Sequence, residues 1–364
     1  MPGGPFWFNR CMHKTITALL LSAALAAHAI EPLPAETMDD TRVFRVEVLQ
    51  VTDIEPYREA LAGFLKSLQA SGLVEGKNLS VHKATIDFDA ENGGFWSKLG
   101  VLLRIRQESS RIVEAKPDLV LTIGTPATKY ARGMMTDARI PLVFTAVANP
   151  EDAGCVSLVD AGEGATGSTL YTDMTDSLKL VKDVFPEVRR IGMVHSDDDN
   201  GIANVAAATA KGKPLGLDVS ARQVSKNEHI APKLKELHAA GAEMFAVPLD
   251  TYYGLHRYEA SMDLGDFGVE NKVPVVTLAM VRVPGAALYI GADFKQVGQL
   301  AGTQAAKILK RHTKPDVLPI LRQETPTVLV DPARLEALKV ALPAQLAARK
   351  TVAANGFWQI ELVK

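Results

Sequence analysis

The sequence has few of the residues on which several classes of protein depend. Its 364 residues include only two cysteines, Cys11 and Cys155, too few for a disulfide framework or a multi-cysteine metal site. Lys and Arg number 40 against 42 Asp and Glu, which leaves a formal net charge of −2, and no long basic run occurs. No basic surface is therefore expected to hold a polyanion, and we predict no nucleic-acid partner.

Long apolar runs are also missing. The run Ile16–Ala27 is too short to cross a bilayer, since a membrane-spanning helix needs about 20 apolar residues. His13 and Lys14 precede it, and Ala27-His28-Ala29 ends it with the small-x-small pattern of a signal-peptidase site. We therefore predict a cleavable secretory signal over residues 1–29; a buried N-terminal helix is the alternative.

The predicted signal has consequences for location. Residues 30–42 resemble a short tether, and both Met1 and Met12 fit as the start of the signal. A lipid anchor would need a cysteine at the cleavage point, whereas Cys11 precedes the apolar run. We expect a soluble periplasmic protein, exported through its signal peptide.

The rest of the chain has the composition of a globular protein, with 47% hydrophobic and 23% charged residues. Short runs rich in Val, Ile and Leu alternate with stretches of helical period, which predicts α/β structure with parallel sheets. The predicted strands cover 43–51, 79–84, 118–123, 141–147, 190–195, 217–224, 243–247, 274–278, 286–290 and 327–330, enough for two sheets. Helices are predicted over 56–71, 97–115 and 172–185.

In open parallel sheets the ligand lies beyond the carboxyl ends of the strands. The predicted loops at those ends carry short hydroxyls, carboxylates, amides and aromatic rings, which suit a small polar or zwitterionic ligand. The candidate ligand-binding residues there are Thr52, Asp53, Thr125, Pro126, Ala148, Asn149, Ser196, Asp199, Asp250, Thr251, Tyr252 and Phe294.

Gly162–Gly167 matches the glycine spacing of a dinucleotide-binding loop. That function needs a helix to begin at the third glycine, whereas Ser168–Tyr171 is β-branched and aromatic and predicts extended chain. We therefore expect no dinucleotide and no other cofactor.

The acidic loop His195–Gly201 has three interpretations. Capping of the following helix is favoured, ligand contact is compatible with capping, and a metal site is the weakest. A calcium loop aligned on Gly201 would place Ala207 where a Glu is required. The remaining histidines show no metal-binding spacing, so no metal is predicted.

No catalytic constellation is visible. There is no GxSxG motif, no Cys-His signature and no persuasive pair of carboxylates. Cys155 stands beside Val156 and is predicted to be a buried structural thiol. Trp96 and Trp358 are predicted to serve packing, whereas Tyr253 and the candidate aromatics Tyr252 and Phe294 fit either a pocket wall or ordinary packing.

An ordered series of short motifs resembles the ABC-transporter substrate-binding protein family that includes tryptophan- and aromatic-amino-acid-binding members. The series covers about residues 43–345. Its motifs are Gly63-Phe64, Glu75-Gly76-Lys77-Asn78, Pro117–Val120, Thr125-Pro126-Ala127, Ile140–Val147 with Pro150, Ala153-Gly154, Thr166-Gly167, Arg190-Ile191-Gly192, Asp250, Gly285-Ala286, Gly291 and Gly298.

The resemblance implies a type I periplasmic-binding fold: two doubly wound Rossmann-like α/β lobes joined by three hinge crossings that close on a ligand. Under this reading the first lobe comprises 43–167 and 287–319, and the second 173–284 and 331–364, including a helix starting at Asp331. The hinge segments are 168–172, 285–286 and 320–330.

The family's ligand motifs are matched only in part. Thr169-Leu170 stands where amino-acid-binding members usually carry Ser-Asp, and Asp250-Thr251 stands where they carry Asp-Asn. Asp199–Ile202 replaces a Glu-x-Asn-Ser string. Asp250 remains a candidate partner for a ligand ammonium, and Thr125 and Thr169 for a carboxylate.

The leading hypothesis is a monomeric solute-binding component of an ABC importer, with a small molecule and a membrane permease as partners. A periplasmic sensor that feeds a membrane signalling protein has the same sequence features. An exported enzyme on this scaffold is the third class, and no reactive set supports it.

Overall fold

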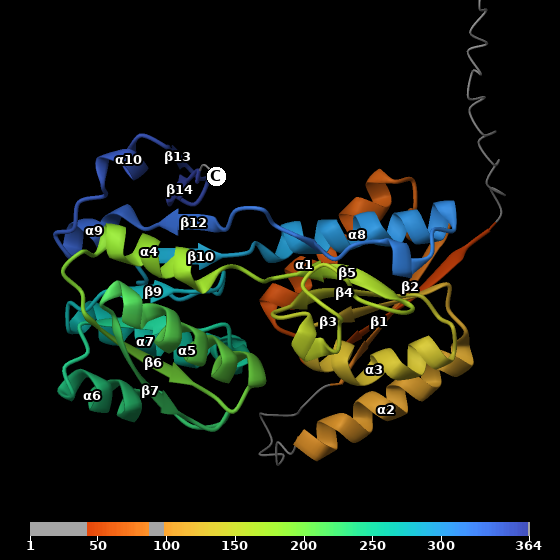
Figure 1. The fold of residues 1–364 in the computed structure, drawn as a ribbon, viewed down its shortest axis with the longest axis horizontal. Helices are drawn as coiled ribbons and strands as arrows, with labels where there is room; N and C mark the ends of the chain where they lie inside the picture. Colours follow the sequence, from red (N-terminus) through yellow and green to blue (C-terminus); the bar gives the residue numbers. More distant parts are fainter. Residues whose placement is uncertain (1–41, 87–97, 363–364) are drawn as a thin grey trace, which may run out of the picture. The chain divides into compact units, whose positions relative to one another are not determined.

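The computed structural model describes residues 42–86 and 98–362, which form two β-sheets covered by helices (Figure 1). The predicted signal peptide, nearly all of the predicted tether, and Trp96 lie outside the described residues. Within the described ranges, no helix combines the length and the apolarity that a membrane crossing requires.

The first sheet has six strands, all parallel, in the order β11-β5-β4-β3-β1-β2. Every residue of β3 and β4 is buried, as expected for central strands with helices on both faces. The strands are β1 Phe44–Gln50, β2 Leu79–Thr85, β3 Leu119–Ile123, β4 Leu142–Val147, β5 Ala165–Thr169 and β11 Leu321–Arg322.

Two pairs of helices cover this sheet and complete the first lobe. α1 (Glu55–Ala70) and α8 (Phe294–Arg311) pack side by side on one face, and α2 (Lys98–Ala115) and α3 (Thr125–Asp137) on the other (Figure 1). A Cβ on Gly298 would collide with the carbonyl group of Ala60. The close approach of α1 and α8 therefore depends on glycine at that position.

The second sheet has eight strands in the order β13-β14-β12-β10-β9-β8-β6-β7. Strands β6 to β10 run parallel, whereas β12 to β14 are added antiparallel at one edge. The strands are β6 Arg190–His195, β7 Asp218–Gln223, β8 Met244–Val247, β9 Val275–Thr277, β10 Leu288–Gly291, β12 Thr327–Val330, β13 Lys350–Val352 and β14 Trp358–Ile360.

Helices on both faces of this sheet complete the second lobe. Buried residues of α4, α5 and α9 share one core cluster, and those of α6 and α7 share another. The helices are α4 Met174–Val184, α5 Asp199–Gly212, α6 Ala231–Ala239, α7 Glu259–Glu270, α9 Pro332–Ala337 and α10 Ala344–Ala347. Short 3₁₀ turns are η1 Glu151–Ala153, η2 Lys213–Leu215, η3 Thr251–Gly254, η4 His256–Tyr258 and η5 Pro315–Val317.

The two sheets repeat one topology. The order β2-β1-β3-β4-β5 in the first is matched by β7-β6-β8-β9-β10 in the second. This is the 2-1-3-4-5 order of doubly wound folds, in which ligands bind at the carboxyl ends of the strands where the order reverses. The predicted α/β class with two doubly wound sheets is confirmed.

All ten predicted strands are present, and four strands were not predicted. β5 is rich in small and hydroxyl residues, and β11, β13 and β14 are at most three residues long or lie late in the chain. The third glycine of the segment Gly162–Gly167 lies within β5, so the predicted extended chain at this position is confirmed. Cys155 is buried as predicted, and Trp358 is half-buried against the second core.

The positions of the crossings need correction. The predicted assignment of 287–319 to the first lobe fails at its start, because β10 pairs with β9 and β12 in the second sheet. The second crossing therefore follows Gly291 instead of lying at 285–286. Likewise 168–169 belongs to β5, and 320–330 contains β11 of the first sheet and β12 of the second. Apolar composition could not reveal these boundaries, since hydrogen-bond partners define them.

Candidate ligand-binding site

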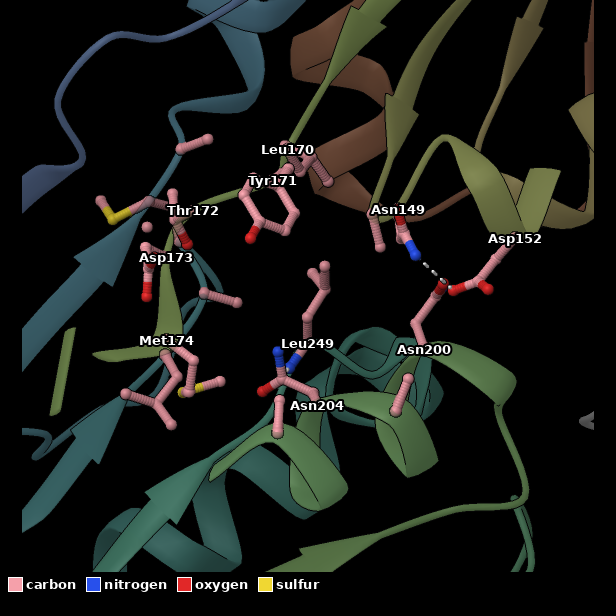
Figure 2. Close-up of a pocket in the computed structure, with 18 of the residues that line it drawn as sticks. Asn149, Asp152, Leu170, Tyr171, Thr172, Asp173, Met174, Asn200, Asn204 and Leu249 are labelled. Atoms are coloured by element: carbon pink, nitrogen blue, oxygen red, sulfur yellow. Dashed lines mark hydrogen bonds between the residues drawn. The ribbon is translucent and has the colours of Figure 1, made fainter. Parts of the chain in front are cut away.

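A cavity of about 240 Å³ lies at the carboxyl ends of strands from both sheets (Figure 2). Its wall is built from the loops after β4, β8 and β9, one face of α5 along its length, and the crossings that follow β5 and β10. Pockets for drug-sized ligands typically hold about 300–1,000 Å³. The space therefore suits one small solute.

The first-lobe wall depends on a bulge in β4. The pairing of β4 with β5 shifts register between Phe144 and Val147, and Ala146 adopts a left-handed φ of 55°. Bulges of this kind redirect the residues that follow them. Here Ala148 and Asn149 come next and line the cavity, and Asn149 Nδ2 donates to Asp152 Oδ2 at 3.1 Å.

The second-lobe wall is one face of α5. The helix begins after Asp198, whose carboxylate accepts from the backbone N–H of Asn200 at 3.0 Å, so the predicted capping role of the acidic loop is confirmed. Helical period places Asn200, Asn204 and Lys211 on the same face, and all three line the cavity. Asn204 is oriented by its Oδ1, which accepts from the backbone N–H of Leu249 at 3.4 Å.

The first crossing supplies the third wall, with Tyr171, Thr172 and Asp173 at its centre. The side chain of Tyr171 projects into the space in Figure 2. Asp173 caps α4 and accepts from the backbone N–H of Thr175 at 2.7 Å, and this hydrogen bond lowers the pKa of Asp173 below its usual range. A carboxylate therefore stands at this wall at neutral pH.

The wall thus combines opposite charges, amides and apolar surface. Asp152 and Asp173 supply carboxylates, Lys211 supplies an ammonium, and Phe294 and Leu249 supply apolar contact. A few polar groups within an apolar wall are the usual composition of a small-molecule site. This set can hold a solute that carries an ammonium, a carboxylate and an apolar side group.

The structure distributes the predicted site residues over several cavities. Ala148, Asn149 and Phe294 line the cavity of about 240 Å³. Thr125, Pro126 and Asp199 line a neighbouring one of about 80 Å³ that shares Asn200 with it. Asp250 and Thr251 line a small space of about 20 Å³ that also contacts Phe294, and Tyr252 lines a cavity within the second lobe.

The remaining predicted residues are engaged within the protein or buried. Thr169 Oγ1 donates to the carbonyl of Val147 at 2.8 Å, and Asp53 forms an ion pair with Arg58 at 3.5 Å. Thr52 is buried. Ser196 Oγ donates to Asp250 at 2.9 Å.

Asp250 belongs to a buried polar cluster beneath the rim of the second lobe. Its carboxylate accepts from the backbone N–H groups of Ser196 at 2.6 Å and Tyr252 at 2.9 Å, besides the Ser196 hydroxyl. Burial, and then the neighbouring carboxylate of Asp198, raise the pKa of Asp250 to about 6. Both carboxylate oxygens of Asp250, which the sequence suggested as partners for a ligand ammonium, thus accept hydrogen bonds from the protein itself.

Asp198 is the ionised member of the same cluster. Thr251 Oγ1 donates to it at 2.6 Å, and Lys226 Nζ lies 3.4 Å from the same oxygen. Burial acts to raise the pKa of Asp198, but the Lys226 ammonium and these hydrogen bonds outweigh it and lower the pKa. The cluster is therefore a buried ion pair beside a carboxyl group that resists ionisation.

Sequence reasoning missed several residues of the cavity wall: Asp152, Tyr171, Asp173, Asn200, Asn204 and Lys211. Two signals point to them. Tyr171 lies inside the predicted first crossing, and the three α5 residues share one helical face at intervals of four and seven residues. That face became a candidate only once the strand-end loops were known to meet it.

Comparison with known proteins agrees with this architecture. The model of the family described as ABC transporter substrate binding protein matches residues 45–353. The tyrosine-binding protein of Clostridioides difficile (strain R20291) is 25% identical to this chain over 305 residues, which are 82% of each protein.

Solved structures are similar in fold. An ABC domain in complex with L-Trp from Streptococcus pneumonia has a TM-score of 0.71 at 20% identity, covering 84% of this chain and 98% of that one. The ligand-free, open structure of a substrate-binding protein with adhesive properties from Clostridium difficile gives 0.63 at 22% identity, covering 83% and 97%. The fold is thus that of type I periplasmic-binding proteins, and the chain belongs to the ABC transporter substrate-binding protein family, whose members bind solutes and are not enzymes.

Proposed function

We propose that this protein is the exported solute-binding component of an ABC importer and that it captures a small zwitterionic ligand, an amino acid with an aromatic or apolar side chain. The observation that carries the proposal is the cavity of about 240 Å³, whose wall contains carboxylates, amides and one lysine from both lobes. The tyrosine-binding relative and the L-Trp complex have ligands of this class.

The geometry suggests a role for each charged group. Asp152 and Asp173 are the carboxylates available to a ligand ammonium, and Lys211 is the cation available to a ligand carboxylate. Tyr171 and Phe294 offer rings against which an apolar side group packs. Asp250 does not line this cavity, and its role is to hold the loops that contain Ser196 and Tyr252 through hydrogen bonds to their backbone N–H groups.

Isothermal titration calorimetry with tyrosine, tryptophan, phenylalanine and leucine tests this proposal, with glutamate and glucose as controls. We expect at least one of the first four to bind, and to raise the unfolding temperature with its concentration. The absence of binding by all four, together with tight binding of an uncharged sugar, would overturn the ligand class.

A matched pair of variants locates the site. Ala203 is an exposed residue of α5 that lines the cavity, whereas Ala206 is exposed on the same helix outside it. Ala203→Trp should fill the space and weaken binding at least about 100-fold, roughly 2.7 kcal/mol, and Ala206→Trp should leave the affinity within about twofold. Equal affinities in the two variants would place the ligand elsewhere.

The importer role requires a membrane permease as partner and export to the periplasm. Fractionation of cells that produce the full chain should place the processed protein outside the cytoplasmic membrane. Co-purification from detergent-solubilised membranes should recover transporter subunits. Recovery of a membrane signalling protein instead would favour the sensor function.

A further inference from the structure

A second cluster of chemically active side chains lies in the second lobe, away from the solute cavity. It borders a cavity of about 300 Å³ between the turn that precedes α6 and the first turns of α7. That cavity shares no lining residue with the one of about 240 Å³. Its chemistry is therefore independent of the proposed solute site.

Three residues from two segments of the chain meet there: His229, Glu259 and Asp263. Glu259 and Asp263 are one turn apart on α7, so both carboxylates lie on one face of the helix. His229 Nδ1 lies 3.1 Å from Glu259 Oε1. One ligand atom from each of the three residues lies within 4.8 Å of the other two.

The cluster carries excess negative charge. Like charges one turn apart on a helix repel each other, and Asp266 adds a third carboxylate nearby. A divalent cation between the carboxylates would remove this repulsion.

A second imidazole lies at the edge of the same cavity. His256 also borders this cavity, and its Nε2 atom is buried with no hydrogen-bond partner within the described part of the chain. A buried imidazole nitrogen without a partner is costly. His256 is not one of the three residues whose ligand atoms approach one another, so it borders the candidate site without being one of its ligands.

We propose that His229, Glu259 and Asp263 form a binding site for a divalent transition metal of the zinc type. One imidazole and two carboxylates are suitable donors for Zn²⁺, and three protein ligands leave a coordination position for water. The imidazole favours such a metal over Ca²⁺ and Mg²⁺, which prefer oxygen donors.

The position of the site suggests a structural effect. Glu259 directly follows Tyr258, whose hydroxyl donates to Glu55 Oε2 at 2.7 Å. Residues 256–258 adopt left-handed φ angles of 47°, 54° and 67°. A metal held by Glu259 and Asp263 would fix the first turn of α7, and with it the segment that contacts α1.

Calorimetric titration of the full chain with ZnCl₂, after dialysis against a chelator, tests the proposal. We expect one Zn²⁺ per chain at this site. His229→Ala and Asp263→Asn should each weaken its affinity at least about tenfold, because changes even outside the ligand shell cost about 10–100-fold. Glu270→Gln, an exposed carboxylate on the same helix outside the cluster, should change the affinity less than twofold.

Anomalous diffraction at the zinc edge from a soaked crystal provides a second measurement. A peak among the three side chains would support the site, and a peak only at other histidines would overturn it. Unchanged zinc affinity in both ligand variants would also overturn it. So would millimolar Ca²⁺ displacing Zn²⁺ with no effect of His229→Ala. Circular dichroism of each variant establishes that it is folded.

Discussion

Asp53 and Asp198 occupy equivalent positions, three residues beyond β1 in the first sheet and three beyond β6 in the second. The side chain of Asp53 is 42% exposed and pairs with Arg58 at the surface. The side chain of Asp198 is only 7% exposed and pairs with the equally buried Lys226. The same backbone position thus carries a solvated charge in one lobe and a buried ion pair in the other.

The loops that follow the next pair of equivalent strands, β3 and β8, differ in the same direction. Thr125 follows β3 and donates through its hydroxyl to Asn200 Oδ1 at 3.1 Å. Asp250 follows β8 and accepts three hydrogen bonds beneath the surface. The charged pair of the first-lobe rim is therefore exposed to solvent, whereas the second-lobe rim contains a buried ion pair and a buried carboxyl group.

At the opposite ends of the strands the two lobes agree. Asp118 accepts from the backbone N–H of Arg45 at 2.8 Å, and Glu243 accepts from those of Arg189 and Arg190 at 2.7 and 3.0 Å. In both lobes a carboxylate joins the starts of two neighbouring strands. The two lobes therefore share their hydrogen bonding at the amino ends of the strands, which we call the base of each sheet. They differ in the burial and pairing of the charged groups in the loops at the carboxyl ends, which form the rim.

The largest effect that sharpens this comparison is expected from Lys226→Met. It would leave the buried carboxylate of Asp198 without its cation, and such losses cost about 3–5 kcal/mol. The first-lobe counterpart, Arg58→Met, removes an exposed partner and should cost at most about 1 kcal/mol. Urea unfolding at pH 7 measures both, and equal losses would mean that the two rims do not differ energetically.

An intermediate effect is expected for Asp250→Asn, and it depends on pH. The raised pKa means that folded Asp250 keeps its proton up to about pH 6, whereas the unfolded side chain loses it near about pH 4. Stability from this group is therefore present at low pH and lost as the pH rises through that window.

Unfolding of wild type and Asp250→Asn at pH 4.5 and pH 7 checks this sign. On going from pH 7 to pH 4.5, the free energy of unfolding of wild type should rise by on the order of 2 kcal/mol relative to that of the variant. Thr125→Val in the first lobe should cost about 0.5–1.5 kcal/mol at both pH values, since a hydroxyl does not titrate. A pH-independent difference for Asp250→Asn would contradict the proposed burial of its charge.

The smallest effects test the agreement at the base. Asp118→Asn and Glu243→Gln should each cost about 0.5–1.5 kcal/mol at pH 7, with similar values. The backbone N–H groups of Arg189 and Arg190 lower the pKa of Glu243, so its stabilising contribution is lost as the pH falls through its folded pKa. Chemical unfolding measured from pH 7 to pH 3 should show that the difference in free energy of unfolding between wild type and Glu243→Gln becomes smaller as the pH falls. If one of the two variants lost about six times as much stability as the other at pH 7, the two carboxylates would not have equivalent roles.

Much of the fold was predictable because its signals are local. The buried strands of both sheets are continuous apolar runs, and Asp173, Asp198 and Asp331 cap the helices that follow them. β5 was not predicted, since its five residues are small or polar. It is a strand because it pairs with β4 and β11, and Gly167 is needed there because a Cβ would collide with the backbone of Phe144.

The site was predictable only in part. Ala148, Asn149 and Phe294 follow strands or crossings, so the rule for parallel sheets found them. Asn204 and Lys211 lie further along α5, and only the meeting of α5 with the β4 loop makes them part of a wall. His229 showed no metal-binding spacing in sequence, because its partners on α7 are thirty or more residues away.

The sequence by itself determined the alternation of strands and helices, the caps and the buried apolar faces, because each depends on residues within a few positions of one another. The tertiary structure decided where the chain crosses between sheets, which carboxylates are buried and paired, and which side chains share a cavity. These features depend on distances between residues far apart in the chain, and both the charge state of Asp250 and the proposed metal site follow from such distances.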